Sequence, residues 1–273
     1  RHRRPGGARV STAFDAVAAD EGPHPPSDEA LWNESWYFDF VDAAAGLGGW
    51  VRLGLYPNED RAWVNVLLCG PGLPTLALND FHAALPDDPA RVRTAGFSLD
   101  LHPQDPARSY RVTATGQAQV YDDPAAALAG TETRSADVSL DLVFDTAGEP
   151  YRYQLATRYE IPCTVSGTVT VGEHTYDVEA AAGQRDHSWG VRDWWGMDWV
   201  WNAIHLDDGS HLHAVEVRIP GLDPVERLIE PLRPRNVGDD GEPARRGGER
   251  LRPCRVEIDD TDAAALHRQR THR

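Results

Sequence analysis

The chain has no lysine, and its only methionine is Met197. All 27 basic residues are arginine; they face 43 acidic residues, so the formal net charge is −16. Nucleic acids and anionic membranes both attract basic surfaces, so we expect neither as a partner. An arginine-only composition is typical of a GC-rich genome. We interpret residues 1–9 as sequence upstream of a translation start at Val10. The Arg-rich C-terminal end is interpreted as the product of a frameshift or a truncation.

Cysteine is also scarce. Cys69, Cys163 and Cys254 are widely separated, so we predict neither a metal-binding pair nor a disulfide framework. No apolar run has the length needed to span a bilayer, and no signal-peptide core is present. A nucleotide-binding G-x-G-x-x-G motif is missing as well. We therefore expect a bacterial, cytoplasmic protein without a cofactor, and the composition leaves its oligomeric state open.

What the chain does have is apolar residues with period two, the spacing of half-buried strands. The pattern predicts strands at Trp36–Val41, Trp50–Tyr56, Arg61–Cys69, Thr75–Asp80, Phe97–His102, Tyr110–Tyr121, Ala136–Asp145, Val165–Val171, Thr175–Ala180, Trp199–Leu206 and Leu212–Ile219. Only Pro124–Ala129 has the pattern of a short helix. Many short strands separated by turns predict an all-β protein, a barrel or a sandwich.

The strand series divides near Pro150, which predicts two successive β-domains. We expect a disordered tail over 1–27, a first domain over 28–150, a second over 151–232 and an irregular Arg-rich tail over 233–273. From Pro231 onward the strand pattern fades, so the second domain is expected to lack its closing strands. An unclosed barrel would leave an exposed sheet edge.

The segment 183–206, GQRDHSWGVRDWWGMDWVWNAIHL, holds five of the nine tryptophans. Within it, Asp186, His187 and Ser188 suggest a catalytic triad, but neighbouring residues of a strand point to opposite faces. Period two instead places Asp186 with Ser188, and His187 with Trp189. His187 is then a candidate to exchange a proton beside the Trp189 ring. The alternative is a buried histidine bonded to the backbone or to Asp193.

Two Arg-Asp pairs lie in the same segment. Arg185 and Arg192 are expected to fork onto carboxylates and hold the segment in shape, with Asp186, Asp193 and Asp198 as candidate partners. In that role Asp186 and Asp193 are structural. The sharper alternative is that both arginines bind an anionic group of a substrate.

The tryptophans of the segment also alternate. Trp199 and Trp201 share a strand face, and Trp195 joins them if the strand continues through Gly196. With Trp194 they are candidates to line an apolar ligand site, where their ring faces would stabilise a developing cation. The alternative is that they belong to an ordinary β-core.

Three further histidines follow, and their grouping depends on the turn between two strands. A three-residue loop at 207–209 places His205 opposite His211, with His213 on the same face, which would suit zinc. A two-residue loop places His205 opposite Leu212 and splits the group. The sequence leaves both registers open, and we predict no metal.

A proton donor for acid chemistry would have to be a carboxyl group in an apolar site. Glu216 is one candidate, since burial among tryptophans would raise its pKa, and Asp198 is another. Glu216 lies on the opposite strand face from His211 and His213. If it is exposed, it is a surface carboxylate paired with Arg218.

The motifs GQRDHSWGVRDWWG and WNAIHLDDGSHLHA resemble those of an uncharacterised bacterial group, the paired DUF7065/DUF7064 domains. The stretches NESWYFDF and GGWVRLGLYPNEDRAWVNVLLCGPG resemble it too, and the likeness runs from about Asp28 to Ile219. The D-H-x-W-G core is more distantly similar to carotenoid 1,2-hydratases (hydroxyneurosporene synthase), AttH-like proteins and some cyclases. After Pro220 the expected last strands are missing.

This resemblance implies two lipocalin-like barrels with an apolar cavity. It also implies that His187 and Trp189 lie at a reacting double bond. We therefore expect binding of a small apolar molecule, isoprenoid, steroid or polyketide-like, with cofactor-free hydration, isomerisation or cyclisation. The alternatives are a non-catalytic carrier of apolar ligands and a metal-dependent hydrolase that uses the histidine cluster.

Overall fold

The computed structural model describes residues 18–129, 134–153, 156–194, 196–218 and 225–232, and almost all of its regular structure is β-strand. The strands are β1 Trp32–Asp42, β2 Leu47–Tyr56, β3 Arg61–Gly70, β4 Leu73–Ala83, β5 Arg91–Arg93, β6 Phe97–Asp105, β7 Ser109–Tyr121, β8 Arg134–Thr146, β9 Tyr151–Arg152, β10 Arg158–Val171, β11 His174–Val191, β12 Asp198–His205, β13 His211–Arg218 and β14 Val225–Leu232. The helices are α1 Pro124–Ala129 and two 3-10 turns, η1 Ala18–Glu21 and η2 Pro57–Glu59. The all-β prediction is confirmed.

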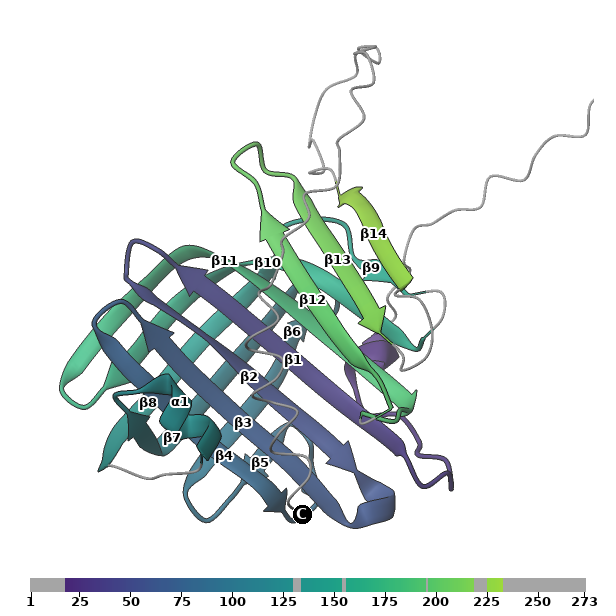
Figure 1. The fold of residues 1–273 in the computed structure, drawn as a ribbon, viewed down its shortest axis with the longest axis horizontal. Helices are drawn as coiled ribbons and strands as arrows, with labels where there is room; N and C mark the ends of the chain where they lie inside the picture. Colours follow the sequence, from purple (N-terminus) through teal and green to yellow (C-terminus); the bar gives the residue numbers. More distant parts are fainter. Residues whose placement is uncertain (1–17, 130–133, 154–155, 195, 219–224, 233–273) are drawn as a thin grey trace, which may run out of the picture. The chain divides into compact units, whose positions relative to one another are not determined.

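Eleven of the strands form one antiparallel sheet in the order β4-β3-β2-β1-β11-β10-β8-β7-β6-β5, with β9 beside β10. A further pairing, β4 with β7, joins distant members of this order and closes the sheet into a barrel. Figure 1 shows β1, β2 and β3 side by side on the near wall, with the β12–β13 hairpin beside β1. The strands β12, β13 and β14 form a separate sheet.

Alternation along β1 shows how the barrel is filled. Trp36, Phe38 and Phe40 point inward and are 1–3% exposed, whereas Val41 points outward and is 65% exposed. Phe38 packs against Phe144 from the opposite wall, with ring centroids 5.2 Å apart. Each such buried side chain contributes about 1.5–3 kcal/mol to folding. The interior is thus a packed core, and a ligand site has to be sought elsewhere.

The strand pairings correct the predicted domain boundary near Pro150. β10 and β11 were expected to begin a second domain, but they pair with β8 and β1 and complete the first barrel. The prediction missed this because it treated 151–162 as a connection, whereas β9 and the start of β10 occupy it. β14 follows Pro220, where the sequence pattern indicated no further strand. The existence of a second domain, built around β12–β14, stays a prediction.

The predicted disordered tail over 1–27 lies outside the described residues up to residue 17, and only residues 18–27 can be compared with it. Ala18–Glu21 forms η1, and Glu21 is buried inside the barrel beside Arg185. An acidic residue is buried this deeply only with a partner, and period-two analysis could not supply one from a distant strand. The predicted tail over 233–273 lies outside the described residues.

Candidate functional site

The strand β11 presents the central motif on two faces, as period two predicts. His187 points into the barrel opposite Trp36, whereas Asp186 points outward opposite Tyr37. Ser188 also points outward, and its Oγ lies 3.0 Å from Ser35 Oγ. The Asp-His-Ser run is therefore not a catalytic triad.

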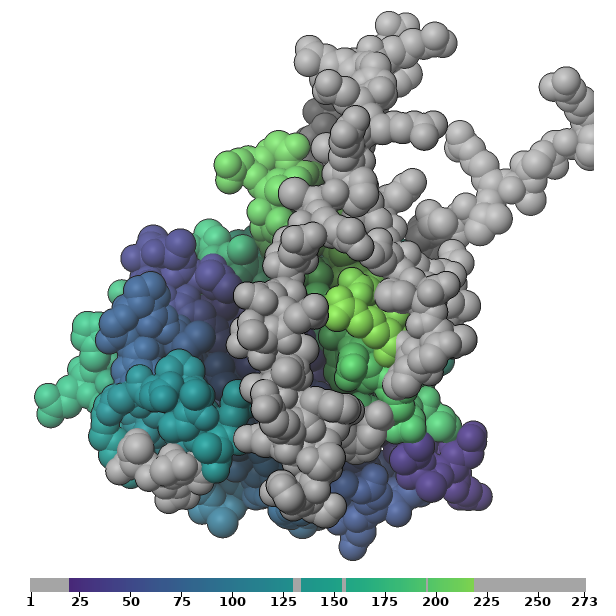
Figure 2. Space-filling model, in the orientation of Figure 1, coloured from purple at the N-terminus to yellow at the C-terminus, as the bar shows by residue number. Residues whose placement is uncertain are grey.

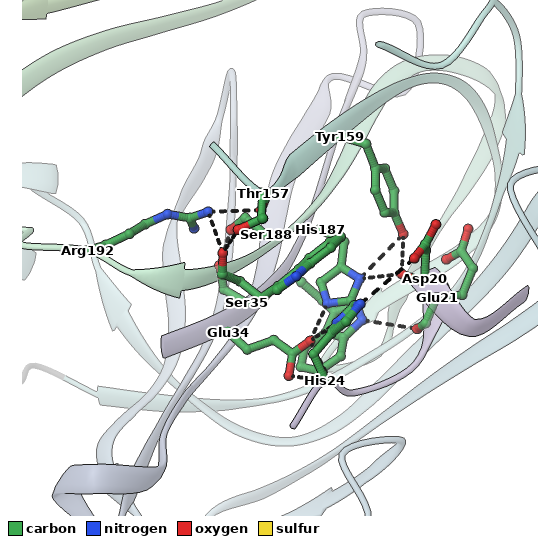
Figure 3. A network of polar contacts seen from close by, with 12 residues as sticks. Asp20, Glu21, His24, Glu34, Ser35, Thr157, Tyr159, His187, Ser188 and Arg192 are labelled. Atoms are coloured by element: carbon green, nitrogen blue, oxygen red, sulfur yellow. Dashed lines mark hydrogen bonds and ion pairs between the residues drawn. The ribbon is translucent and has the colours of Figure 1, made fainter. Parts of the chain in front are cut away.

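Inside the barrel, His187 is held on both ring nitrogens (Figure 3). Its Nδ1 donates to the Asp20 carbonyl at 2.8 Å, and its Nε2 lies 2.9 Å from Glu34 Oε1. The imidazole stacks on the Trp36 ring with centroids 4.4 Å apart. The His187 and Glu34 side chains are each 1% exposed. The acid beside the motif histidine is therefore Glu34.

A second histidine completes this cluster. His24 Nδ1 lies 2.7 Å from Glu34 Oε1, and the His24 backbone N–H donates to both oxygens of that carboxylate at 3.1 and 3.0 Å. Its ring stacks on Trp189 with centroids 3.8 Å apart and an angle of 8°. Among the described residues, His24, Glu34 and His187 are the group whose donor atoms converge as metal ligands would. We call this group the inner cluster.

Neither new member was predicted. Glu34 carried a usable signal, because it shares the inward face of β1 with Trp36 and Phe38, where an acid needs a partner. His24 carried none, since it lies in the non-periodic stretch GPHPPS.

Arg185 and Arg192 bind partners other than the expected ones. Arg185 faces the barrel interior, away from Asp186, and forks onto Glu21 at 2.9 and 3.0 Å. Burial alone would raise the pKa of Glu21, but the Arg185 guanidinium outweighs it and keeps that pKa below its usual value. Arg192 Nη2 donates to the carbonyls of Thr157 and Trp189 at 3.1 and 3.3 Å.

Burial is the main reason that the pKa of Arg192 falls to about 10, with nearby Arg158 adding to the effect. Of the predicted carboxylate partners, Asp186 Oδ2 accepts from Arg158 at 2.7 Å, and Asp193 is exposed. Burial also raises the pKa of Asp186, in spite of Arg158.

The outer face of the barrel meets the second sheet through a buried acid, Glu160. Its Oε1 accepts from Trp201 Nε1 at 3.0 Å, and its Oε2 accepts from Gln184 Nε2 at 3.1 Å. The Trp201 ring also lies edge-on to Tyr37, with centroids 5.7 Å apart. Trp201 therefore docks the second sheet on the barrel, which is a structural role.

Two other tryptophans of the motif, Trp194 and Trp199, contact each other. Trp194 Nε1 donates to Asn33 Oδ1 at 3.3 Å, and its ring lies 5.2 Å from that of Trp199. Trp199 is 45% exposed. Trp195 lies outside the described residues.

The structure fixes the register of β12 and β13, the strands that carry these histidines. His205 pairs with His211, as the three-residue loop requires, and their ring centroids are 4.4 Å apart. His213, however, uses Nδ1 on the Asn202 carbonyl at 2.9 Å and Nε2 on the Tyr153 hydroxyl at 2.5 Å. A three-histidine metal site is therefore not assembled, because His213 has no nitrogen left for an ion.

The two predicted proton donors are in unsuitable places. Glu216 pairs with Arg218 on the face of β13 that points away from Trp201. Asp198 is exposed at the start of β12. Neither position is an apolar site, so the burial expected of a proton donor is not seen at Glu216 or Asp198.

A groove of about 490 Å³ lies between the outer barrel wall and β12. The ladder register explains its composition, because Asp39, Trp50 and Leu67 are successive partners across β1, β2 and β3. Its lining is mainly apolar and includes Val41, Trp50, Leu67, Ala182, Ala203 and Ile204. Figure 2 shows the green β12–β13 hairpin beside the purple and blue barrel strands.

Two polar side chains, Asp39 and His205, also line this outer groove. Burial raises the pKa of Asp39 to about 7, although the backbone N–H of Gln184 donates to its Oδ1 at 2.9 Å. Burial lowers the pKa of His205, whose Nε2 is buried without a hydrogen-bond partner in the part of the chain that the structure describes. A neutral histidine and a partly protonated acid thus share one groove.

An antiparallel barrel of the lipocalin-like kind, with an apolar groove on its outer wall, is the class that these features define. The chain belongs to the family described as a domain of unknown function, DUF7064, whose model matches residues 17–228. The expected pairing with DUF7065 stays a prediction. In the described part of the chain, no helix has the length and apolar character to cross a membrane.

A solved structure shows a similar fold. A protein provisionally named AttH from Nitrosomonas europaea is similar at 16% identity and a TM-score of 0.54, covering 80% of this chain and 73% of that one. CghA is similar at 9% identity and a TM-score of 0.38, covering 72% of this chain and 58% of that one. No curated protein matches the sequence.

Proposed function

We propose that the protein binds a small, largely apolar molecule in the outer groove. The observation that carries this proposal is the groove itself, about 490 Å³ with a mainly apolar lining. Small-molecule sites usually enclose about 300–1,000 Å³ and combine apolar walls with a few polar groups. The AttH-like fold supports the proposal only as an architecture suited to ligand binding.

Exposed apolar side chains support the same location. Val41 and Ile204, on opposite sides of the groove, are 65% and 43% exposed. Clustered exposure of this kind is typical of a binding surface. The Trp50 ring gives the ligand a flat aromatic wall, and it stacks beside Tyr37 with centroids 6.0 Å apart.

The groove also has the groups for acid–base chemistry without a cofactor. Because the pKa of Asp39 is about 7, its carboxyl group is protonated in part of the protein molecules at neutral pH. It would protonate a carbon–carbon double bond, and the Trp50 face would stabilise the resulting cation. His205 would then take a proton from the adjacent carbon, or from water that adds to the cation. The first outcome is isomerisation, and the second is hydration.

Asp39 thus replaces Glu216 and Asp198 in the proposed acid role, and His205 replaces His187. The rival function is a non-catalytic carrier of apolar ligands, which uses the same groove and needs no proton donor.

The test begins with native mass spectrometry of protein purified from its own host, to identify a co-purified apolar molecule. Turnover of that molecule is then compared between wild type, Asp39→Asn and the matched control Glu216→Gln. We expect bound ligand, and loss of turnover in Asp39→Asn alone. Ligand without turnover in wild type would establish the carrier. A polar or anionic ligand would contradict the proposal as a whole.

A further inference from the structure

We propose that the inner cluster, His24, Glu34 and His187, binds a divalent transition-metal ion of the zinc type at the end of the barrel. The donor atoms of all three side chains lie within 4.8 Å of one another. They come from three parts of the chain: the segment after η1, the strand β1 and the strand β11. This site is separate from the outer groove and goes beyond the proposed function.

The donor set suits zinc. Two imidazole nitrogens and one carboxylate oxygen form a ligand combination that zinc uses, with an open fourth position. Histidines that bind metals usually donate their other ring N–H to a carbonyl or carboxylate, which fixes the ring and its tautomer. His187 does this through Nδ1, which donates to the Asp20 carbonyl at 2.8 Å. For His24, the Asp20 carboxylate lies 3.9 Å from Nε2.

The spacing also suits an ion. Glu34 Oε1 lies 2.7 Å from His24 Nδ1 and 2.9 Å from His187 Nε2. Zinc bound at about 2.0–2.2 Å from tetrahedral ligands separates the donors by about 3.3 Å. Each histidine nitrogen therefore needs to move away from Glu34 Oε1 by only about half an ångström. The His24 backbone N–H, which donates to both Glu34 oxygens, holds the carboxylate in place during this change.

The structural consequence is a clamp. His24 lies in the segment between η1 and β1, whereas Glu34 and His187 belong to the barrel wall. An ion shared by the three fixes that segment to the wall. Metal binding should therefore raise the thermal midpoint of unfolding, because the unfolded chain has no preformed site.

The experiment uses the full chain, freed of metal by chelation and titrated with Zn²⁺ in a calorimeter. One ion should bind per chain. Thermal unfolding should shift upward with Zn²⁺, and Co²⁺ should give the visible absorption of a tetrahedral site. Glu34→Gln keeps the side-chain shape, so it tests the site with the least risk to folding; it should lose the bound ion, as should His24→Ala.

Two matched controls address histidines outside the inner cluster. His82→Ala removes an exposed histidine, and His205→Ala removes one of the facing pair on β12 and β13. Both should keep full Zn²⁺ binding and the upward shift. Absence of Zn²⁺ binding in wild type would overturn the proposal. So would binding that survives in Glu34→Gln, or that is lost in His205→Ala. None of these results changes the ligand tests of the outer groove.

Discussion

Arg185 forks onto Glu21 inside the barrel, with N···O distances of 2.9 and 3.0 Å and both side chains 2% exposed. The two residues are 164 positions apart, so the pair ties the N-terminal segment to the last barrel strand. Because η1 brings Glu21 and Asp20 to this end of the barrel, the pair also supports the carbonyl that orients His187.

Removal of one partner of the Arg185–Glu21 pair should therefore lower the stability of the fold. Arg185→Ala leaves the Glu21 carboxylate buried and unpaired, and we expect a loss of about 3–5 kcal/mol in the free energy of unfolding. Urea denaturation measures it. The matched control is Arg111→Ala, which breaks the exposed Arg111–Asp141 pair and should leave the midpoint nearly unchanged. Equal effects of the two substitutions would show that the interior pair has no special role.

A glycine in the β10 bulge should tolerate no side chain. Gly167 has φ +144°, and a Cβ there would lie 2.0 Å from the Asp141 carbonyl oxygen. Gly167→Ala should cost more than about 1–3 kcal/mol, because backbone strain and this clash add. Gly96→Ala is the control, since its Cβ would meet nothing within 4 Å. Chemical denaturation of both variants measures the difference in their free energies of unfolding. A Gly167→Ala variant as stable as wild type would contradict the bulge geometry.

The pH dependence of stability should report Asp39. Its pKa is about 7 in the folded protein, above the value of 3.8 for an unperturbed carboxyl group. Between these values the folded state holds a proton that the unfolded state has lost, so this residue makes stability fall as pH rises toward 7. The contribution is complete below the unfolded pKa and is lost above the folded one.

Asp39→Asn removes this titration and keeps the acceptor for the Gln184 N–H. We expect the variant to lose less stability than wild type between pH 5 and pH 8, measured by urea denaturation at a series of pH values. A variant whose pH profile matches that of wild type would place the pKa of Asp39 near its usual value. Asp39 would then be unsuited to proton donation.

Much of the fold followed from local pattern. Period two located most strands and placed His187 and Asp186 on opposite faces, because side-chain alternation is a property of each strand alone. The partner of His187 could not be found this way. Glu34 lies 153 residues away, and only the pairing of β1 with β11 brings the two together.

The outer groove was missed for a related reason. Asp39 and Trp50 become neighbours through the register of β1 and β2, and His205 reaches the groove only when the second sheet packs on the barrel. The tryptophan-rich motif attracted attention by composition, yet Trp201 serves the contact between sheets. Composition indicated where the chain is densely packed, and register decided which residues share a site.

The most direct test of the proposed function is the affinity of an uncharged apolar dye, Nile red, for two matched variants. Val41→Glu places a charge in the outer groove, whereas Leu128→Glu places one at an apolar position on α1 that is 83% exposed. Fluorescence titration should show binding to wild type and to Leu128→Glu with the same Kd, and binding about tenfold weaker to Val41→Glu, a change of about 1.4 kcal/mol. Equal affinity in Val41→Glu and wild type, with both variants folded by circular dichroism, would contradict ligand binding in the groove.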